Sequence, residues 1–122
     1  MNFLFVGLGG AVGAMLRYAM SLIPCKTEFP IITLVTNIVG ALAIGFIVGF
    51  ASKRNFSDNA MLFLKTGLCG GFTTFSTFSL EAFNLFHNGS YLMSGVYVVL
   101  SAVMCILGVW AGVMLANAVV KE

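Results

Sequence analysis

The chain has very few charged residues, and this shortage excludes most classes of soluble protein. Only 8% of its 122 residues are charged, while 60% are hydrophobic, against about 25% and about 45–50% in ordinary soluble domains. A single His and three Cys without paired spacing leave no metal-ligand cluster and no nucleophile–base pair. We therefore expect an integral membrane protein that is not an enzyme.

Proline is also scarce, and its two positions help to divide the chain into membrane helices. A hydrocarbon core of about 30 Å takes roughly 20 helical residues per crossing, so a chain of this length accommodates four crossings with short connections. Pro24 ends the first helix and Pro30 suits the first turn of the second. The first segment lacks a basic n-region and an A-x-A cleavage site, so we expect it to be retained. The predicted architecture is one four-helix membrane domain, residues 1–122, with helices at about 2–23, 30–51, 60–86 and 91–119.

Glycine is plentiful, and its spacing predicts close helix packing. Two glycines four residues apart lie on one helix face and let two backbones approach, which is how helices associate where lipid supplies no hydrophobic drive. We expect a compact bundle or an oligomer. Such pairs occur in all four segments, as Gly9 and Gly13, Gly45 and Gly49, Gly67 and Gly71, and Gly108 and Gly112.

The distribution of Lys and Arg residues favours one orientation of the chain in the membrane only weakly. If the N-terminus is cytoplasmic, four Lys or Arg residues lie toward that side and two toward the other. A difference of two in Lys/Arg bias orients a membrane protein feebly, so copies are expected to insert both ways up. The four are Lys53, Arg54, Lys65 and Lys121, and the two are Arg17 and Lys26.

The run from Gly70 to Ser79 places two glycines and a hydroxyl-rich, Phe-studded stretch inside the third segment. Non-helical backbone at membrane depth survives only where protein or a water-filled path surrounds it. We predict that Gly70 and Gly71 open this helix at a pathway or an ion site. The plainer alternative is that Ser and Thr bond to their own helix carbonyls and that the glycines only allow packing.

Other polar side chains lie within the predicted spans. Asn37 and Thr33 are one turn apart on the second helix, and Glu81 lies on the third. A carboxylate at such a depth is hydrogen-bonded, protonated or close to water. Arg17 could reach the headgroups along its long stem. A possible polar stripe on the fourth helix is formed by Tyr97, Ser101 and Cys105.

Three motifs in order resemble one known family. They are Gly-x-x-Gly-Ala-x-x-Arg-Tyr at residues 10–18, Thr-Asn-Ile-Val-Gly at residues 36–40, and Gly-Leu-Cys-Gly-Gly-Phe-Thr-Thr-Phe-Ser-Thr-Phe-Ser-Leu-Glu at residues 67–81. Together they resemble the Fluc (CrcB-like) fluoride channels of microbes. The resemblance covers essentially the whole chain in length, helix count and motif order.

The resemblance implies an antiparallel, dual-topology homodimer in the bacterial cytoplasmic membrane. Two narrow pores at the dimer interface would export fluoride passively and give fluoride resistance, and one structural sodium ion would lie at the centre. The feeble charge bias agrees with dual insertion. The expected partners are therefore fluoride, sodium, the lipid bilayer and a second copy of the chain.

The resemblance also implies roles for single residues. Phe75 and Phe78 would line the pores with their electropositive ring edges facing the anion. Asn37 would donate its amide N–H to fluoride, and Arg17 would lie toward the aqueous mouth. The backbone carbonyls of two residues, Gly70 and Thr73, would hold sodium. A polar track beside the Phe rings would be formed by Thr33, Ser76, Thr77, Glu81, Tyr97 and Ser101. Cys105 departs from the Ser expected one turn after Ser101.

Two other functions remain open from the residues alone. A small dual-topology exporter of cationic drugs would need a central carboxylate to exchange protons, and Glu81 is the candidate within the membrane. This chain lacks the supporting set of Trp and Tyr that cation binding would use, since it has one Trp. A structural membrane subunit would need neither Asn37 nor a broken helix.

Overall fold

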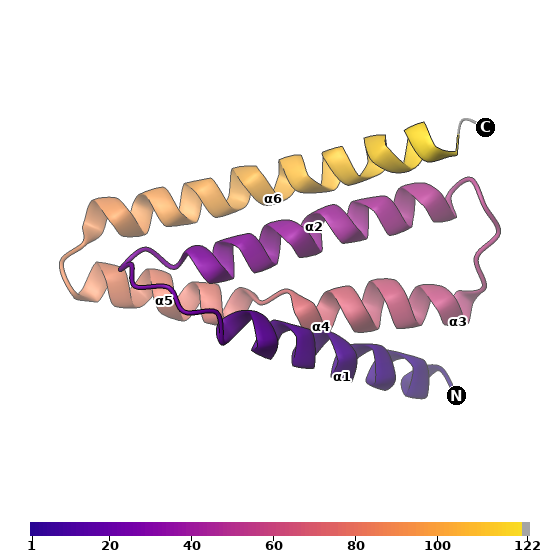
Figure 1. The fold of residues 1–122 in the computed structure, drawn as a ribbon, viewed down its shortest axis with the longest axis horizontal. Coiled ribbons are helices and arrows are strands. Elements are labelled where there is room, and N and C mark those ends of the chain that lie inside the picture. The colour runs from indigo at the N-terminus through magenta and orange to yellow at the C-terminus, as the bar shows by residue number, and fades with distance from the viewer. Residues whose placement is uncertain (121–122) are drawn as a thin grey trace.

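The computed structural model describes residues 1–120, and over these residues the chain is helical with no strand. Helix α1 covers Asn2–Ser21, α2 covers Ile31–Ala51, and α6 covers Tyr91–Val119. The third segment consists of α3 (Asp58–Met61), the π-helix η1 (Leu62–Cys69), α4 (Gly70–Phe72) and α5 (Phe75–His87). The segments run side by side in alternating directions (Figure 1). The prediction of an all-helical membrane protein with a broken third helix is confirmed.

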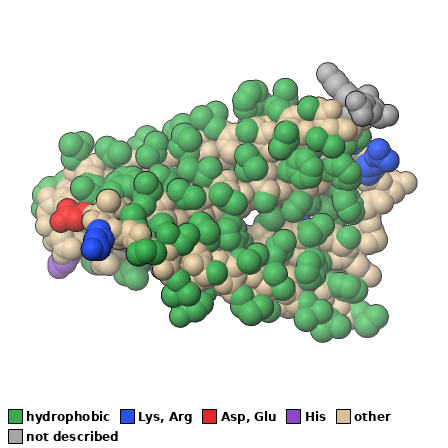
Figure 2. Space-filling model, viewed as in Figure 1, with side chains coloured by type: hydrophobic (Ala, Val, Ile, Leu, Met, Phe, Trp, Pro, Cys, Tyr) green, Lys and Arg blue, Asp and Glu red, His purple; other side chains and the backbone are tan. Residues whose placement is uncertain are grey.

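The segments have the length and character of membrane crossings. Among the described residues, α1, α2 and α6 are long and apolar enough to span a bilayer. The start of α1, the 52–57 loop and the end of α6 gather at one end of the molecule, and the other two connections gather at the opposite end (Figure 1). Hydrophobic side chains cover most of the visible surface between these ends (Figure 2). The molecule is therefore a multi-pass membrane protein.

Two of the helix bounds differ from the sequence-based ones by two residues. α1 ends at Ser21, and the third segment begins at Asp58. The earlier start of the third segment has a local cause, because the Ser57 hydroxyl accepts a hydrogen bond from the Ala60 N–H at 3.2 Å. A Ser in this position caps the exposed N–H groups of a first helical turn.

The glycine pairs join the four segments into two close pairs within one chain. A Cβ on Gly13 would collide with the backbone of η1 and α4 at Leu68 and Phe72, and a Cβ on Gly45 would collide with the backbone of α6 at Val109. Thus α1 packs on η1 and α4, and α2 packs on α6, with backbones close enough to exclude a methyl group. The close helix approach predicted from glycine spacing is confirmed, and these glycine contacts hold together the helices of a single chain.

The helix break lies three residues later than predicted, at Thr73 and Thr74, so the prediction that Gly70 and Gly71 open the helix is wrong. Gly70 keeps helical angles, with φ −63° and ψ −38°, and α4 continues to Phe72. The extended residues are Thr73, with φ −78° and ψ 157°, and Thr74, with φ −146° and ψ 120°. The break therefore depends on groups that bind these threonines.

A π-helix immediately before the break was not predicted from the sequence. η1 covers eight residues, and π-helical turns are rare and are found frequently at functional sites. At the end of η1, the backbone carbonyl of Cys69 accepts two hydrogen bonds from Thr73. One comes from the backbone N–H at 3.0 Å and the other from the side-chain hydroxyl at 2.9 Å. The last residue of η1 is thereby hydrogen-bonded to Thr73, the first extended residue of the break.

Candidate functional site

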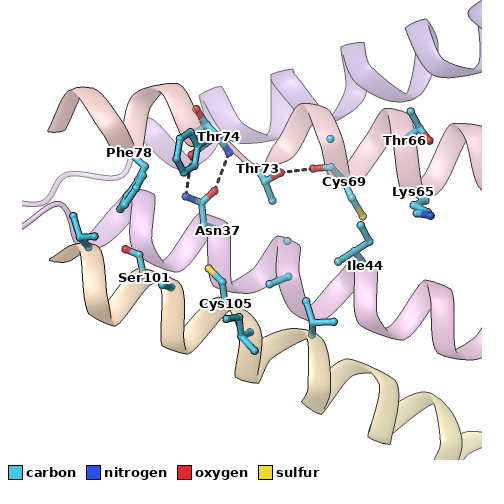
Figure 3. Close-up of a pocket in the computed structure, with 18 residues that line it drawn as sticks. Asn37, Ile44, Lys65, Thr66, Cys69, Thr73, Thr74, Phe78, Ser101 and Cys105 are labelled. Carbon is cyan, nitrogen blue, oxygen red and sulfur yellow. Dashed lines mark hydrogen bonds between the residues drawn. The ribbon is translucent and has the colours of Figure 1, made fainter. Parts of the chain in front are cut away.

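The break is held open by one side chain from another helix. The Thr74 N–H donates to Oδ1 of Asn37 at 2.8 Å, and Nδ2 of Asn37 donates to the Thr74 carbonyl at 3.0 Å, as the dashed lines in Figure 3 show. Thr74 in turn caps α5, because its hydroxyl accepts from the Thr77 N–H at 3.1 Å. Asn37 thus replaces, with one amide, helical hydrogen bonds that the third segment gives up.

Because of these hydrogen bonds, two backbone carbonyls lose the N–H donors that they would have in a continuous helix. In an unbroken α-helix the Gly70 carbonyl accepts from the N–H of Thr74, and the Thr73 carbonyl accepts from the N–H of Thr77. In this chain the first N–H donates to Asn37 and the second to the Thr74 hydroxyl. The two oxygens that the resemblance assigns to sodium are therefore free for another partner. Neutral carbonyl oxygens are the ligand type that hard cations prefer.

The break faces a groove that runs along α2, between the third segment and α6 (Figure 3). Its volume is about 750 Å³, which is far more than a small ion fills. A Cβ added to Gly70 on the groove wall would meet nothing within 4 Å. The groove is therefore open in a single chain. Its lining residues are Asn37, Gly40, Ala41, Ile44, Lys65, Thr66, Cys69, Gly70, Thr73, Thr74, Phe75, Phe78, Val98, Ser101, Ala102, Cys105, Ile106 and Val109.

A row of aromatic rings leads from the exposed side of the groove into the protein. The ring centroids of Phe75 and Phe78 are 5.4 Å apart, and those of Phe78 and Tyr97 are 5.1 Å apart. Phe75 is 80% exposed, whereas Tyr97 is completely buried. The row ends at Phe29 of the 22–30 loop, which packs at 82° to the Tyr97 ring. Along this row, burial increases from the exposed Phe75 to the fully buried Tyr97.

Polar side chains follow the inner part of this row. Thr33 donates to Oε1 of Glu81 at 2.6 Å, which joins α2 to α5. Among residues 1–120, the Tyr97 hydroxyl and the Ser101 hydroxyl are buried polar groups without a hydrogen-bond partner. Leaving a buried hydroxyl unsatisfied costs about 1–3 kcal/mol, so both hydroxyls are available to a further hydrogen-bond partner. Of the two, Ser101 lines the groove directly.

The structure brings only part of the predicted site to the groove. Residues of the predicted set that line it are Asn37, Gly70, Thr73, Phe75, Phe78 and Ser101, with Cys105 beside them. Thr33, Glu81 and Tyr97 are not among the lining residues. Ser76 is exposed on the first turn of α5, and Thr77 contributes its backbone N–H to the cap.

Arg17 takes a different position from the other predicted residues. Its Nε donates to the Gly71 carbonyl at 3.1 Å, so it ties α1 to the backbone just before the break. It does not line the groove of the single chain. Here it stabilises the end of α4, where carbonyl groups lack helical donors.

Sequence reasoning missed several residues that the fold brings to the site. Thr74 is the central one, and its position directly before the helix α5 is a capping signal that could have identified it. Cys69 and Lys65 line the groove from η1, while Phe29 reaches the aromatic row from a loop. No local pattern distinguishes these three from packing or surface residues.

Comparisons with known proteins identify the family. A family model described as CrcB-like protein, Camphor Resistance (CrcB), matches residues 4–113. The chain belongs to this CrcB-like family. The matched range includes every residue that lines the groove.

Individual relatives of this CrcB-like chain share one name. A protein of Roseiflexus sp. (strain RS-1) is 42% identical over 116 residues, which cover 92% of this chain and 94% of the relative. One of Ruminiclostridium cellulolyticum is 44% identical over 122 residues, covering 97% and 94%. One of Flavobacterium psychrophilum is 41% identical over 117 residues, covering 93% and 94%. All three are named "Fluoride-specific ion channel FluC".

Proposed function

We propose that this chain is a fluoride-specific ion channel that exports fluoride passively across the bacterial cytoplasmic membrane and gives fluoride resistance. The observation that carries the proposal is near-full-length similarity, at about 40% identity, to relatives named fluoride-specific ion channels. A channel catalyses no covalent chemistry, so the chain is not an enzyme. The family also decides between the alternatives that the residues leave open, and it disfavours both the drug exporter and the inert structural subunit.

The chemistry of the groove supports this function. Fluoride is small and strongly hydrated, so a pathway must replace its water shell with donors that bind weakly enough to release it. The second N–H of the Asn37 amide is not used by Thr74, and the Ser101 hydroxyl has no partner within residues 1–120. Both are neutral donors. The edges of Phe75 and Phe78 add weakly positive C–H groups beside them.

We infer that a second, antiparallel copy closes the groove into narrow pores. Three observations support this. The volume of the groove in one chain is far larger than an ion fills, and Gly70 faces open space although other glycines of the third segment are tightly packed. The charge bias of the chain permits insertion in both orientations. A symmetric pathway is then completed by the same surface on both copies.

The proposed sodium site lies where the two copies meet. Gly70 and Thr73 each offer one carbonyl without a helical donor, so two chains related by a twofold axis supply four oxygens. Four neutral oxygens suit a monovalent cation, whose role would be to hold the two broken helices together. Asn37 and Thr74 contribute by keeping the carbonyls free of N–H donors.

A flux assay tests the proposed function. The purified protein is placed in liposomes loaded with fluoride or, as the control, with chloride, and external anion is followed with an ion-selective electrode. We expect fast fluoride efflux without a proton gradient and no measurable chloride efflux. Fluoride efflux that requires a proton gradient would indicate a coupled transporter with Glu81 as the titrating group. No efflux of either anion would contradict the channel.

A further inference from the structure

Lys65 is the one charged residue among those that line the groove. It lies on η1, is exposed in the single chain, and is followed on the same wall by Thr66. Figure 3 shows it at one end of the groove, away from the cluster of Asn37, Thr74 and Phe78. In residues 1–120 no carboxylate lies within 4 Å of its ammonium group. Lys65 therefore places an unpaired positive charge inside a surface that is otherwise neutral.

The depth of Lys65 makes this charge unusual. It follows the first residue of α3, Asp58, by seven positions, which is about 10 Å along a helix axis at 1.5 Å per residue. Charged residues at such a depth are rare in membrane segments and mark ion pathways when they face a cavity. A lysine on a lipid-facing surface could extend to the headgroups. Lys65, however, faces the groove that holds the proposed pathway.

The direction of the side chain places its charge toward water. Side chains on a helix lean toward its N-terminus, and the N-terminus of the third segment is the end that carries the 52–57 loop (Figure 1). The ammonium group thus lies between the loop end of the membrane and the break.

The proposed antiparallel dimer places Lys65 near a pore of the assembly, and the inference therefore rests on the proposed function. A twofold axis that brings the carbonyls of Gly70 and Thr73 from both copies together passes between these positions. Lys65, which precedes the axis by six or seven residues, then lies at the height of Phe78 of the partner subunit. Its ammonium extends farther outward, to the entrance of the pore that this Phe lines.

We propose that Lys65 collects fluoride at the pore entrance. Its ammonium attracts the anion into the outer part of the groove, from which the anion moves to the neutral donors deeper in the groove. Because the charge lies outside the narrow part, it raises the local anion concentration without creating a deep binding site in the pore. In a twofold dimer each of the two pores receives one such lysine, contributed by the chain opposite the aromatic row.

The test compares Lys65→Met with Lys53→Met. Both variants remove one positive charge from the same end of the molecule, so both change the orientation bias equally, but Lys53 lies in the 52–57 loop outside the groove. Fluoride flux through purified dimers is measured at fixed low fluoride and at ionic strengths of about 20 mM and about 500 mM, where the Debye length falls from roughly 20 Å to roughly 4 Å. We expect Lys65→Met to reduce flux about threefold at low ionic strength and to match wild type at high ionic strength. Lys53→Met should change flux by less than about 1.3-fold at both.

Two further variants separate charge from packing. Lys65→Arg keeps the charge and should retain wild-type flux, whereas Lys65→Gln should behave like Lys65→Met and supplies the uncharged variant if the latter fails to form dimers. An equal loss at both ionic strengths, or a Lys65→Arg protein as slow as Lys65→Met, would overturn the inference. Normal wild-type flux with unchanged flux in both uncharged variants would overturn it as well. Absence of fluoride flux in the wild type would instead overturn the proposed function, and the role of Lys65 with it.

Discussion

Replacing Asn37 by Leu should destabilise the protein because the helix break depends on this amide. The change removes both hydrogen bonds to the Thr74 backbone, at 2.8 and 3.0 Å. Thr74 is only 9% exposed, so water cannot readily replace the lost partners. A buried polar group without a partner costs about 1–3 kcal/mol, and two such groups give an expected loss of roughly 2–6 kcal/mol in the free energy of unfolding.

Thermal unfolding of the purified protein in detergent, read by circular dichroism, measures this loss, and fluoride efflux from liposomes measures its consequence. Asn37→Asp keeps an acceptor for the Thr74 N–H but loses the donor toward the Thr74 carbonyl. An ionised Asp also places a negative oxygen against the Thr74 carbonyl, so Asn37→Asp should lose at least as much stability as Asn37→Leu, and its carboxylate should repel fluoride and abolish efflux.

The matched control is Thr36→Val on the neighbouring residue of α2. Thr36 is 2% exposed, but its hydroxyl donates only to the Ile32 carbonyl of its own helix, at 2.7 Å. Its replacement should cost less than about 1 kcal/mol because the remaining carbonyl keeps its helical donor. If Asn37→Leu were no less stable than Thr36→Val, the argument that Asn37 holds the break open would be refuted.

Four further predictions follow from the proposed channel. Phe75→Ile and, separately, Phe78→Ile should leave dimer yield normal and reduce fluoride efflux at least tenfold; loss of assembly instead would indicate that the rings only pack. A C-terminal tag should be accessible from both membrane faces in comparable amounts, and labelling from one face alone would contradict dual topology. Sodium should raise the melting temperature of the dimer with increasing concentration while a large organic cation does not, and Gly70→Val should weaken that response; unchanged stability and flux after refolding without sodium would contradict the site. Finally, Gly71→Ala should destabilise the single chain because its Cβ meets the Gly10 backbone, whereas Gly70→Ala, with nothing within 4 Å, should affect only assembly; equal effects on an isolated monomer would refute this distinction.

The sequence by itself determined the class, the number of crossings and the family. Hydrophobic length decides how many times a chain crosses a bilayer, and this property is a sum over neighbours in the sequence. The motifs around Arg17, Asn37 and residues 67–81 determined the resemblance that the family match bears out. Glycine spacing also predicted close packing correctly, because residues four apart share a helix face whatever lies opposite.

Only the tertiary structure decided where the third helix breaks and which residues meet at the groove. Local propensity favoured a break at Gly70 and Gly71, but glycine only permits one, and here Gly71 is needed for contact with α1. The break occurs at Thr73 and Thr74 because Asn37, thirty-seven positions before Thr74, satisfies the backbone there. Likewise, Lys65 becomes a groove residue only through the face that η1 turns toward α2. Hydrogen-bond satisfaction at a break depends on atoms brought from other helices, and no window of neighbouring residues contains them.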